Sequence, residues 1–328
     1  LVVEHEHARP DATRAPRGSL TVPLLLFDPR VKRWTNIPYG DQAGSRQLLD
    51  IYAPPGGARD APVLFQIHGG AWSIGHKAQQ ARPLLFHMAR AGWVCVSINY
   101  RLSPRARWPD HIVDVKRALA WVRANISEYG GDPDFVMVTG GSAGGHLSAL
   151  AALTGNDPRW QPGFEQADTR VQAAAPVYGV YDFTNRAGTD QHGSMRVVLE
   201  RYVLQASFRK NPELFEQASP FYRVSEDAPP FFVVHGRNDS LATVEDARQF
   251  VDALRARSEQ PVAYAELPYT QHAFDVFNSL RSPALVRSIE RFGRIVHRDY
   301  LQVRGPQRSG TASGAICAPG KPEQVNEL

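Results

Sequence analysis

The 328-residue sequence is poor in cysteine, in long apolar runs and in excess charge of either sign. Its two cysteines, Cys95 and Cys317, are too few for a disulfide-dense scaffold or an all-cysteine zinc site. The longest early apolar run, residues 22–27, contains Pro23 and falls far short of the roughly 20 residues that a membrane-spanning helix needs. The 37 basic and 33 acidic residues leave a net charge of +4, which is too small to indicate a nucleic-acid partner.

Nothing in the sequence indicates a metal or a bound cofactor, and we expect none. The zinc-peptidase pattern His-Glu-x-x-His does not occur, and His5 and His7 have a poor spacing for zinc. We expect a soluble chain without a membrane span. Because the sequence begins with Leu1 rather than Met, it leaves open whether a signal or anchor segment precedes it, and whether the compartment is the cytoplasm or the cell envelope.

The composition along the chain divides it into an arm, a domain and a tail. Residues 1–18 are polar and proline-bearing, as in an arm, and residues 303–328 have the Gly, Pro, Ser and Gln content of a disordered tail. Residues 19–302 predict one α/β domain, since single domains of this class reach this size. Residues 179–229 interrupt the regular alternation of strand-like and helix-like segments in this domain, and we expect them to form a small helical cap-like insertion.

Short apolar segments alternate with amphipathic ones throughout this domain. The apolar segments predict strands over residues 45–52, 63–67, 93–98, 135–138, 171–177, 231–234 and 262–267. The amphipathic segments predict helices over residues 80–91, 109–128, 143–153, 244–257 and 283–300. This order predicts an α/β fold with a mostly parallel, doubly wound sheet and helices on both faces.

The sequence Gly-Gly-Ser-Ala-Gly-Gly at residues 140–145 lies directly between a predicted strand and a predicted helix. In this context G-x-S-x-G is typical of a nucleophile elbow, in which a sharp turn exposes a serine hydroxyl at the carboxyl end of the sheet. The glycines of the turn let neighbouring segments approach without Cβ clashes. The pattern alone also fits a plain tight turn, but its placement favours Ser142 as a nucleophile.

A second glycine-rich segment, His68-Gly-Gly-Ala-Trp72, follows the predicted strand 63–67. Acyl transfer develops a negative oxygen that needs preorganised N–H donors, and consecutive glycines expose such groups. The backbone N–H groups of Gly69, Gly70 and Ala143 are therefore the candidate oxyanion hole. We expect the ring of His68 to brace this loop by hydrogen bonding rather than to transfer protons.

A serine nucleophile needs a base and an orienting carboxylate. Asp239 follows the predicted strand 231–234, and His272 follows the predicted strand 262–267. Both loops leave the carboxyl ends of strands, where open α/β sheets bind ligands. In hydrolases whose nucleophilic serine lies on a sharp strand-to-helix turn, the serine comes first in the chain, the acid second and the histidine last. Ser142, Asp239 and His272 follow this order. We therefore predict these three residues to be the catalytic triad.

Other acids and histidines fit these roles less well. Asp227 precedes a proline pair, and Glu245 and Asp246 suit the positive end of the helix that they open. His235 precedes a glycine turn, which indicates a structural role. The other histidines lie in the arm, in predicted helices or in other loops: His5, His7, His76, His87, His111, His192 and His297.

Taken together, these motifs resemble the α/β-hydrolase superfamily, and specifically lipolytic carboxylesterases related to hormone-sensitive lipase. The resemblance runs from about residue 33 to residue 300. It depends on HGGAW (68–72), NYRLSP (99–104), GGSAGG (140–145), SPFYRVSEDAPPFFVVHGRND (219–239) and QHAF (271–274) in this order. It implies the α/β-hydrolase fold and a serine hydrolase that acts on short- or medium-chain acyl esters without a cofactor. It assigns the same triad and the same three oxyanion donors.

Two departures from the family pattern bear on the substrate. Ala71 stands where the family often has a third glycine, and Gly141 stands where it often has an acidic residue. Both departures also resemble a neighbouring branch that includes aryl formamidases, so an amide substrate is the alternative to an ester. A non-catalytic binding protein of the same fold is the less favoured alternative, because it would need neither the triad nor the glycine loop.

The sequence does not identify the natural ester or the length of its acyl chain. It also leaves the oligomeric state open, and a homodimer is one possibility. Aromatic side chains near the motifs are candidates to line an acyl or aryl pocket, although most aromatics of a globular protein lie in its core. These candidates are Trp72, Phe86, Tyr100, Tyr178, Tyr181, Phe183, Phe221 and Tyr222.

Overall fold

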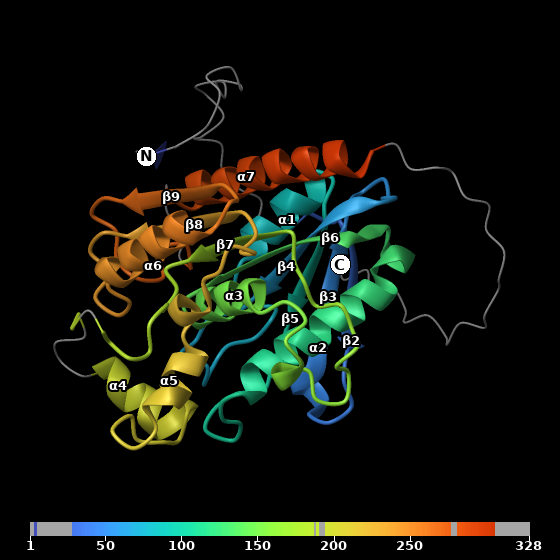
Figure 1. Ribbon diagram of the computed structural model, residues 1–328. Coiled ribbons are helices and arrows are strands. Elements are labelled where there is room, and N and C mark those ends of the chain that lie inside the picture. Colours follow the sequence, from blue (N-terminus) through green and yellow to red (C-terminus); the bar gives the residue numbers. More distant parts are fainter. Residues whose placement is uncertain (1–2, 5–27, 187, 190–193, 277–280, 306–328) are drawn as a thin grey trace.

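The computed structural model describes residues 3–4, 28–186, 188–189, 194–276 and 281–305 (Figure 1). In this part of the chain, nine strands form one sheet in the order β1-β9-β8-β7-β6-β4-β5-β3-β2. The strands are β1 Val3–Glu4, β2 Lys32–Pro38, β3 Leu48–Ala53, β4 Ala61–Ile67, β5 Val94–Ile98, β6 Gly131–Gly141, β7 Ala173–Val177, β8 Phe231–Gly236 and β9 Val262–Leu267. The six strands β4 to β9 are mutually parallel, and β1, β2 and β3 pair antiparallel at the two edges.

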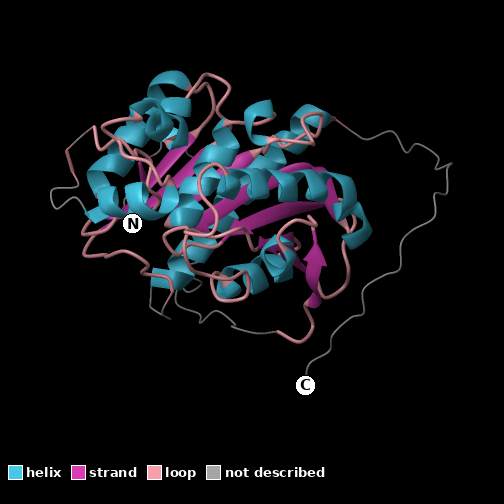
Figure 2. Cartoon of the chain, turned by 90° about the horizontal axis from the view of Figure 1, so that it is seen from below, coloured by secondary structure: helices cyan, strands magenta, loops and turns pink. Residues whose placement is uncertain are grey.

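Helices cover both faces of the sheet, as predicted (Figures 1 and 2). They are α1 Arg82–Arg90, α2 Asp110–Asn125, α3 Ala143–Leu153, α4 Ser194–Val198, α5 Pro212–Ala218, α6 Val244–Arg257 and α7 Arg281–Arg304. Helices α1 and α7 pack on one face, and α2, α3 and α6 pack on the other. The predicted α/β architecture is therefore confirmed.

The central strands have apolar side chains on both faces because both faces are covered. In β4, Phe65 belongs to the core under α2, α3 and α6, whereas its neighbour Leu64 belongs to the core under α1 and α7. In β6, Val136 and Met137 divide in the same way. This alternation explains why the strands appear in the sequence as continuous apolar runs rather than as alternating ones.

The structure differs from the predicted elements mainly near the ends of the chain. Strand β2 was not predicted, because Asn36 has a positive φ of 59° and the register with β3 shifts between Trp34 and Ile37, which breaks the apolar alternation. Helix α7 continues to Arg304, so the predicted tail begins at least two residues too early. Strand β1, inside the predicted arm, pairs with β9. The rest of the predicted arm and tail lies outside the described residues.

The insertion between β7 and β8 consists of short helical pieces. It contains α4, a π-helical turn over Leu199–Val203, α5 and a 3-10 turn over Pro220–Arg223. Several hydrogen bonds attach it to the main domain. Among them, the N–H of Trp108 donates to the carbonyl of Val203 at 2.8 Å, and His146 Nε2 bonds the carbonyl of Ala218 at 2.7 Å. The insertion is therefore fixed beside α3, the helix that follows Ser142.

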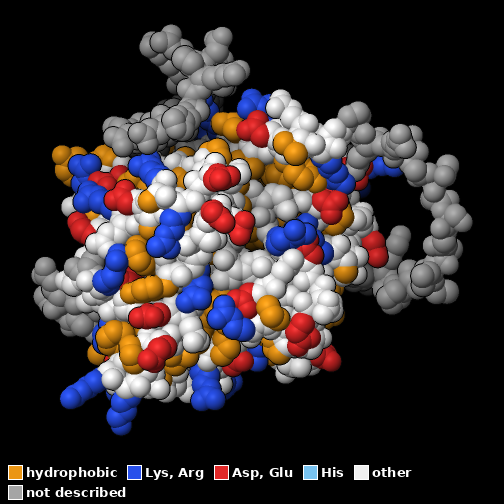
Figure 3. Space-filling model, in the orientation of Figure 1, with side chains coloured by type: hydrophobic (Ala, Val, Ile, Leu, Met, Phe, Trp, Pro, Cys, Tyr) orange, Lys and Arg blue, Asp and Glu red, His pale blue; other side chains and the backbone are white. Residues whose placement is uncertain are grey.

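Charged side chains of both signs are interspersed over the face drawn in Figure 3. This distribution agrees with the small net charge of +4.

Candidate active site

Ser142 occupies the turn between β6 and α3 with a φ of 58° and a ψ of −121°, a strained backbone for a residue other than glycine. The turn packs closely against β4. A Cβ atom on Gly140 would lie 2.4 Å from the carbonyl oxygen of Ile67, and one on Gly144 would lie 2.1 Å from the same oxygen. Only glycine fits at these two positions, so the G-x-S-x-G sequence here has the geometry of a nucleophile elbow.

The structure brings Ser142, His272 and Asp239 into one hydrogen-bonded chain. The distance from His272 Nε2 to Ser142 Oγ is 2.8 Å, and that from His272 Nδ1 to Asp239 Oδ2 is 2.7 Å. An ionised carboxylate only accepts hydrogen bonds, so Nδ1 carries the proton and Nε2 accepts from the serine hydroxyl. The tautomer is thus the one that can take the serine proton.

The carboxylate of Asp239 is fully enclosed and held by its own loop. Its Oδ1 accepts from the N–H groups of Leu241 and Ala242, each at 2.9 Å, which leaves Oδ2 for His272. His235 lies 3.5 Å from the same Oδ2, but its Nε2 bonds the carbonyl of Ala242 at 2.7 Å. Burial lowers the pKa of His235, so it stays neutral and structural, as the sequence indicated.

The glycine loop lies directly against the elbow. A Cβ atom on Gly69 would lie 2.5 Å from the carbonyl oxygen of Gly141, and the N–H of Gly69 donates to Oε1 of Gln80 at 2.7 Å. This N–H is therefore already engaged. The N–H groups of Gly70, Ala71 and Ala143 donate to no acceptor among the described residues, which leaves them available to an oxyanion.

A family model described as BD-FAE matches residues 49–254, more than half of the sequence. The chain belongs to the BD-FAE family. The probable carboxylic ester hydrolase LipM of Mycobacterium tuberculosis is 56% identical over 285 residues, which are 86% of this chain and 64% of LipM. Esterase LipC of the same organism is 46% identical over 290 residues, which are 88% of this chain and 71% of LipC. This BD-FAE chain thus spans a little under two thirds of LipM. The matches confirm the resemblance to lipolytic carboxylesterases.

The fold of this BD-FAE member is also that of solved esterases. Esterase B from Lactobacillus rhamnosis superposes with a TM-score of 0.70 at 23% identity, over 84% of this chain and 89% of that one. At this identity the likeness concerns the fold alone, and it confirms the predicted α/β-hydrolase fold.

His68 braces the glycine loop of this BD-FAE chain from inside, as predicted. Its Nδ1 bonds the carbonyl of Gly69 at 2.7 Å, and its ring stacks on Tyr100 at 4.4 Å between centroids. The hydroxyl of Tyr100 donates to the carbonyl of His68 at 3.0 Å. Burial lowers the pKa of His68 to about 4, so the ring is neutral and does not act as a base near neutral pH.

A second buried histidine joins the glycine loop to α3 and to the insertion. Trp72 Nε1 donates to His146 Nδ1 at 3.1 Å, and His146 Nε2 bonds the carbonyl of Ala218 at 2.7 Å. The ring of His146 stacks on Phe183 at 4.5 Å. Burial lowers its pKa to about 3, which keeps Nδ1 free to accept from Trp72. One neutral side chain thus links three segments around the elbow.

The aromatic residues predicted as pocket candidates lie in different environments. Six are buried, as most aromatics are: Trp72, Phe86, Tyr100, Tyr178, Tyr181 and Phe183. Phe221 and Tyr222 are half-buried in the insertion. Tyr178 is the one whose ring lies against the triad, 4.9 Å from the His272 ring.

Sequence reasoning missed two residues that contact the site: Gln80, which accepts from the N–H of Gly69, and Asp275, which accepts from the hydroxyl of Tyr178. It singled out Tyr178 as a candidate pocket residue but did not predict its bond to Asp275. Asp275 follows His272 by three positions, which is the one sequence signal that could have drawn attention to it.

Two kinds of feature are absent from the described part of the chain. No group of three His, Cys, Asp or Glu side chains there could hold a metal ion. Every helix there is too short or too polar to cross a bilayer.

Proposed function

We propose that this protein is a serine carboxylesterase that hydrolyses short- to medium-chain acyl esters. The observation that carries the proposal is the hydrogen-bonded chain from Ser142 through His272 to Asp239 on a strained elbow. The names of LipM and LipC, a probable carboxylic ester hydrolase and an esterase, support the same reaction.

In the acylation step, Ser142 Oγ attacks the ester carbonyl while His272 Nε2 takes its proton. Asp239 holds the imidazole in place and stabilises the imidazolium that forms. The carbonyl oxygen becomes negative, and the N–H groups of Gly70, Ala71 and Ala143 receive it. The N–H of Gly69 contributes indirectly, because its bond to Gln80 fixes the loop.

In the second half of the reaction, the imidazolium gives its proton to the leaving alcohol. Water then attacks the acyl-enzyme, with His272 again as the base, and the acid is released. Each proton taken in one step is returned in the next, so the protein ends in its starting state.

The insertion over residues 179–229 acts in this proposal as a cap that limits the acyl chain. Its attachment to His146 and Trp108 supports this role, since both contacts lie on the side of the sheet that carries α3. A cap made of short, fixed helices favours short and medium chains over long ones.

Hydrolysis of p-nitrophenyl esters from acetate to palmitate tests the proposal. The wild-type rate is expected to peak at short or medium chains. Ser142→Ala should lose at least about 1,000-fold in kcat while its melting temperature stays unchanged. Ser127→Ala, an exposed serine on a 3-10 turn, is the matched control and should keep full activity.

Activity that survives in Ser142→Ala would overturn the assignment of the nucleophile. The p-nitroanilide of the best acyl group, assayed beside its ester, separates the esterase from an amide hydrolase. No turnover of either substrate by folded wild-type protein would favour the binding-protein alternative.

A further inference from the structure

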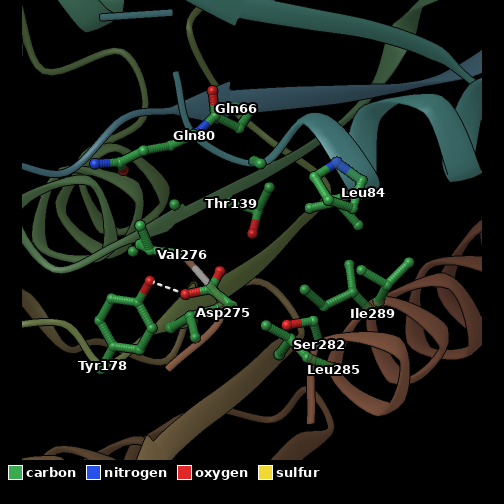
Figure 4. A pocket seen from close by; sticks show the side chains of 16 residues that line it. Gln66, Gln80, Leu84, Thr139, Tyr178, Asp275, Val276, Ser282, Leu285 and Ile289 are labelled. Atoms are coloured by element: carbon green, nitrogen blue, oxygen red, sulfur yellow. Dashed lines mark hydrogen bonds between the residues drawn. The ribbon is translucent and has the colours of Figure 1, made fainter. Parts of the chain in front are cut away.

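A tyrosine–carboxylate pair outside the triad joins the nucleophile side of the site to the histidine side. Tyr178 follows β7 directly, and its hydroxyl donates to Oδ1 of Asp275 (Figure 4). Asp275 lies three residues after His272, on the same loop. The pair thus connects two segments that are 97 residues apart in the sequence.

The position of Tyr178 is fixed from several sides. Its backbone φ is +37°, and its N–H donates to the carbonyl of Val234 at 2.7 Å. Its ring meets the His272 ring edge-on, with centroids 4.9 Å apart. A Cβ atom on Gly141 would lie 2.5 Å from the hydroxyl oxygen of Tyr178. The tyrosine therefore occupies the space beside the elbow in which a side chain at position 141 would lie.

The charges around the pair are suited to a hydrogen bond from the phenol to a carboxylate. Burial and the nearby carboxylate of Asp275 raise the pKa of Tyr178 well above its usual value, so the phenol keeps its proton. Burial raises the pKa of Asp275 overall, and the bond from Tyr178 and the attraction of His272 make this rise smaller. The tyrosine hydroxyl thus favours the charged form of a carboxyl group near the imidazole.

We infer that Tyr178 and Asp275 are positioning residues that clamp the His272 loop onto the nucleophile elbow and supply a second negative charge to the imidazolium. This inference rests on the proposed function. The clamp fixes the distance between His272 and Ser142, on which proton transfer depends. The charge of Asp275 adds to that of Asp239 in the step in which the imidazole becomes positive.

Two substitutions separate these effects. Tyr178→Phe keeps the ring against His272 and removes the hydroxyl, and Asp275→Asn keeps the shape and removes the charge. Each should lower kcat about tenfold and change KM by less than about twofold, because the lost interactions act on proton transfer and not on substrate binding. Tyr264→Phe is the matched control: its hydroxyl donates to Glu266 on β9 at 3.1 Å, away from the site, and its kcat should stay at the wild-type value.

The pH profile of kcat/KM distinguishes positioning from a merely structural role. The titratable groups that face His272 are Asp239, Asp275, His235 and Tyr178. The substitution Asp275→Asn removes the negative charge of one of these groups, which makes the protonated imidazole of His272 less stable. The acid limb of the profile should therefore move to lower pH in Asp275→Asn and stay in place in Tyr264→Phe.

Melting temperatures of all variants accompany the kinetics. Wild-type kcat and an unshifted acid limb in both folded variants would overturn the inference. A drop in melting temperature without a change in kcat would overturn it as well, because the pair would then act on stability alone. If one variant fails to fold, the kcat and the pH profile of the other variant still test the inference. The proposed function fails separately, when the wild type is inactive or Ser142→Ala is active.

Discussion

At Ser142 the backbone is strained, and the surrounding contacts must hold it. A residue other than glycine in such a conformation costs about 1–3 kcal/mol. The N–H of Ser142 donates to the carbonyl of Val177 at 3.0 Å, and the carbonyl of Ser142 accepts from the N–H of His146 at 2.9 Å. These bonds, and the close packing of the elbow on β4, keep the hydroxyl aimed at His272.

The packing of the elbow leads to a prediction about Gly144. A methyl group there would lie 2.1 Å from the carbonyl oxygen of Ile67, so the backbone must move. Gly144→Ala should lose about 3 kcal/mol of unfolding free energy or more, and the folded fraction should lose activity with it. Urea unfolding measures the loss.

Gly56→Ala is the control for this experiment, since a Cβ atom at Gly56 would meet no atom within 4 Å. It should unfold as the wild type does. Wild-type stability in Gly144→Ala would show that the elbow tolerates a side chain at this position and that the close approach is not a constraint.

At the scale of elements, the loops after β7, β8 and β9 must keep a fixed arrangement, because each carries a residue of the site. Helix α6 supports the first of these loops. Oδ2 of Asp246, in the first turn of α6, accepts from the N–H of Tyr181 at 2.8 Å. Burial raises the pKa of Asp246 to about 7. The sequence indicated only that Asp246 suits the helix dipole.

The raised pKa predicts how stability depends on pH. Between the unfolded value of roughly 4 and the folded value of about 7, the folded protein binds a proton that the unfolded chain has released. This carboxyl therefore contributes a loss of stability as the pH rises through that window. Asp246→Asn should remove that contribution, while its amide oxygen still accepts from Tyr181.

Urea unfolding at pH 5 and pH 8 checks this prediction. The fall in unfolding free energy between the two pH values should be smaller in Asp246→Asn than in the wild type. Asp252→Asn, an exposed residue of the same helix, should behave as the wild type. An equal fall in both variants would contradict the prediction.

At the scale of the whole molecule, the sequence predicted those elements and site residues that a local pattern of apolar, glycine and proline residues marks. Strand β9 and helices α3 and α6 have the predicted bounds. Their apolar patterns are regular over their full lengths, and Pro261 and Pro268 also mark the two ends of β9. Ser142, Asp239 and His272 could be selected because each follows a strand whose carboxyl end meets the same edge of the sheet.

What the sequence did not predict depends on contacts between distant segments. The bond from Gly69 to Gln80 depends on how a loop folds back, and no residue pattern marks it. The pair of Tyr178 and Asp275 needs the register of β7 against the loop after β9, which periodicity does not specify. Both residues also have common alternative roles, since most tyrosines and aspartates lie in cores or on surfaces.

The central claim is that Ser142 is a nucleophile activated by His272 and Asp239. The most direct test is intact-mass and peptide mass spectrometry after treatment with a fluorophosphonate, which bonds covalently to an activated serine. We predict one adduct per chain, on the peptide that contains Ser142, with labelling at least about 100-fold slower in His272→Ala. No adduct on the folded wild-type protein, or an adduct on another serine, would contradict the account.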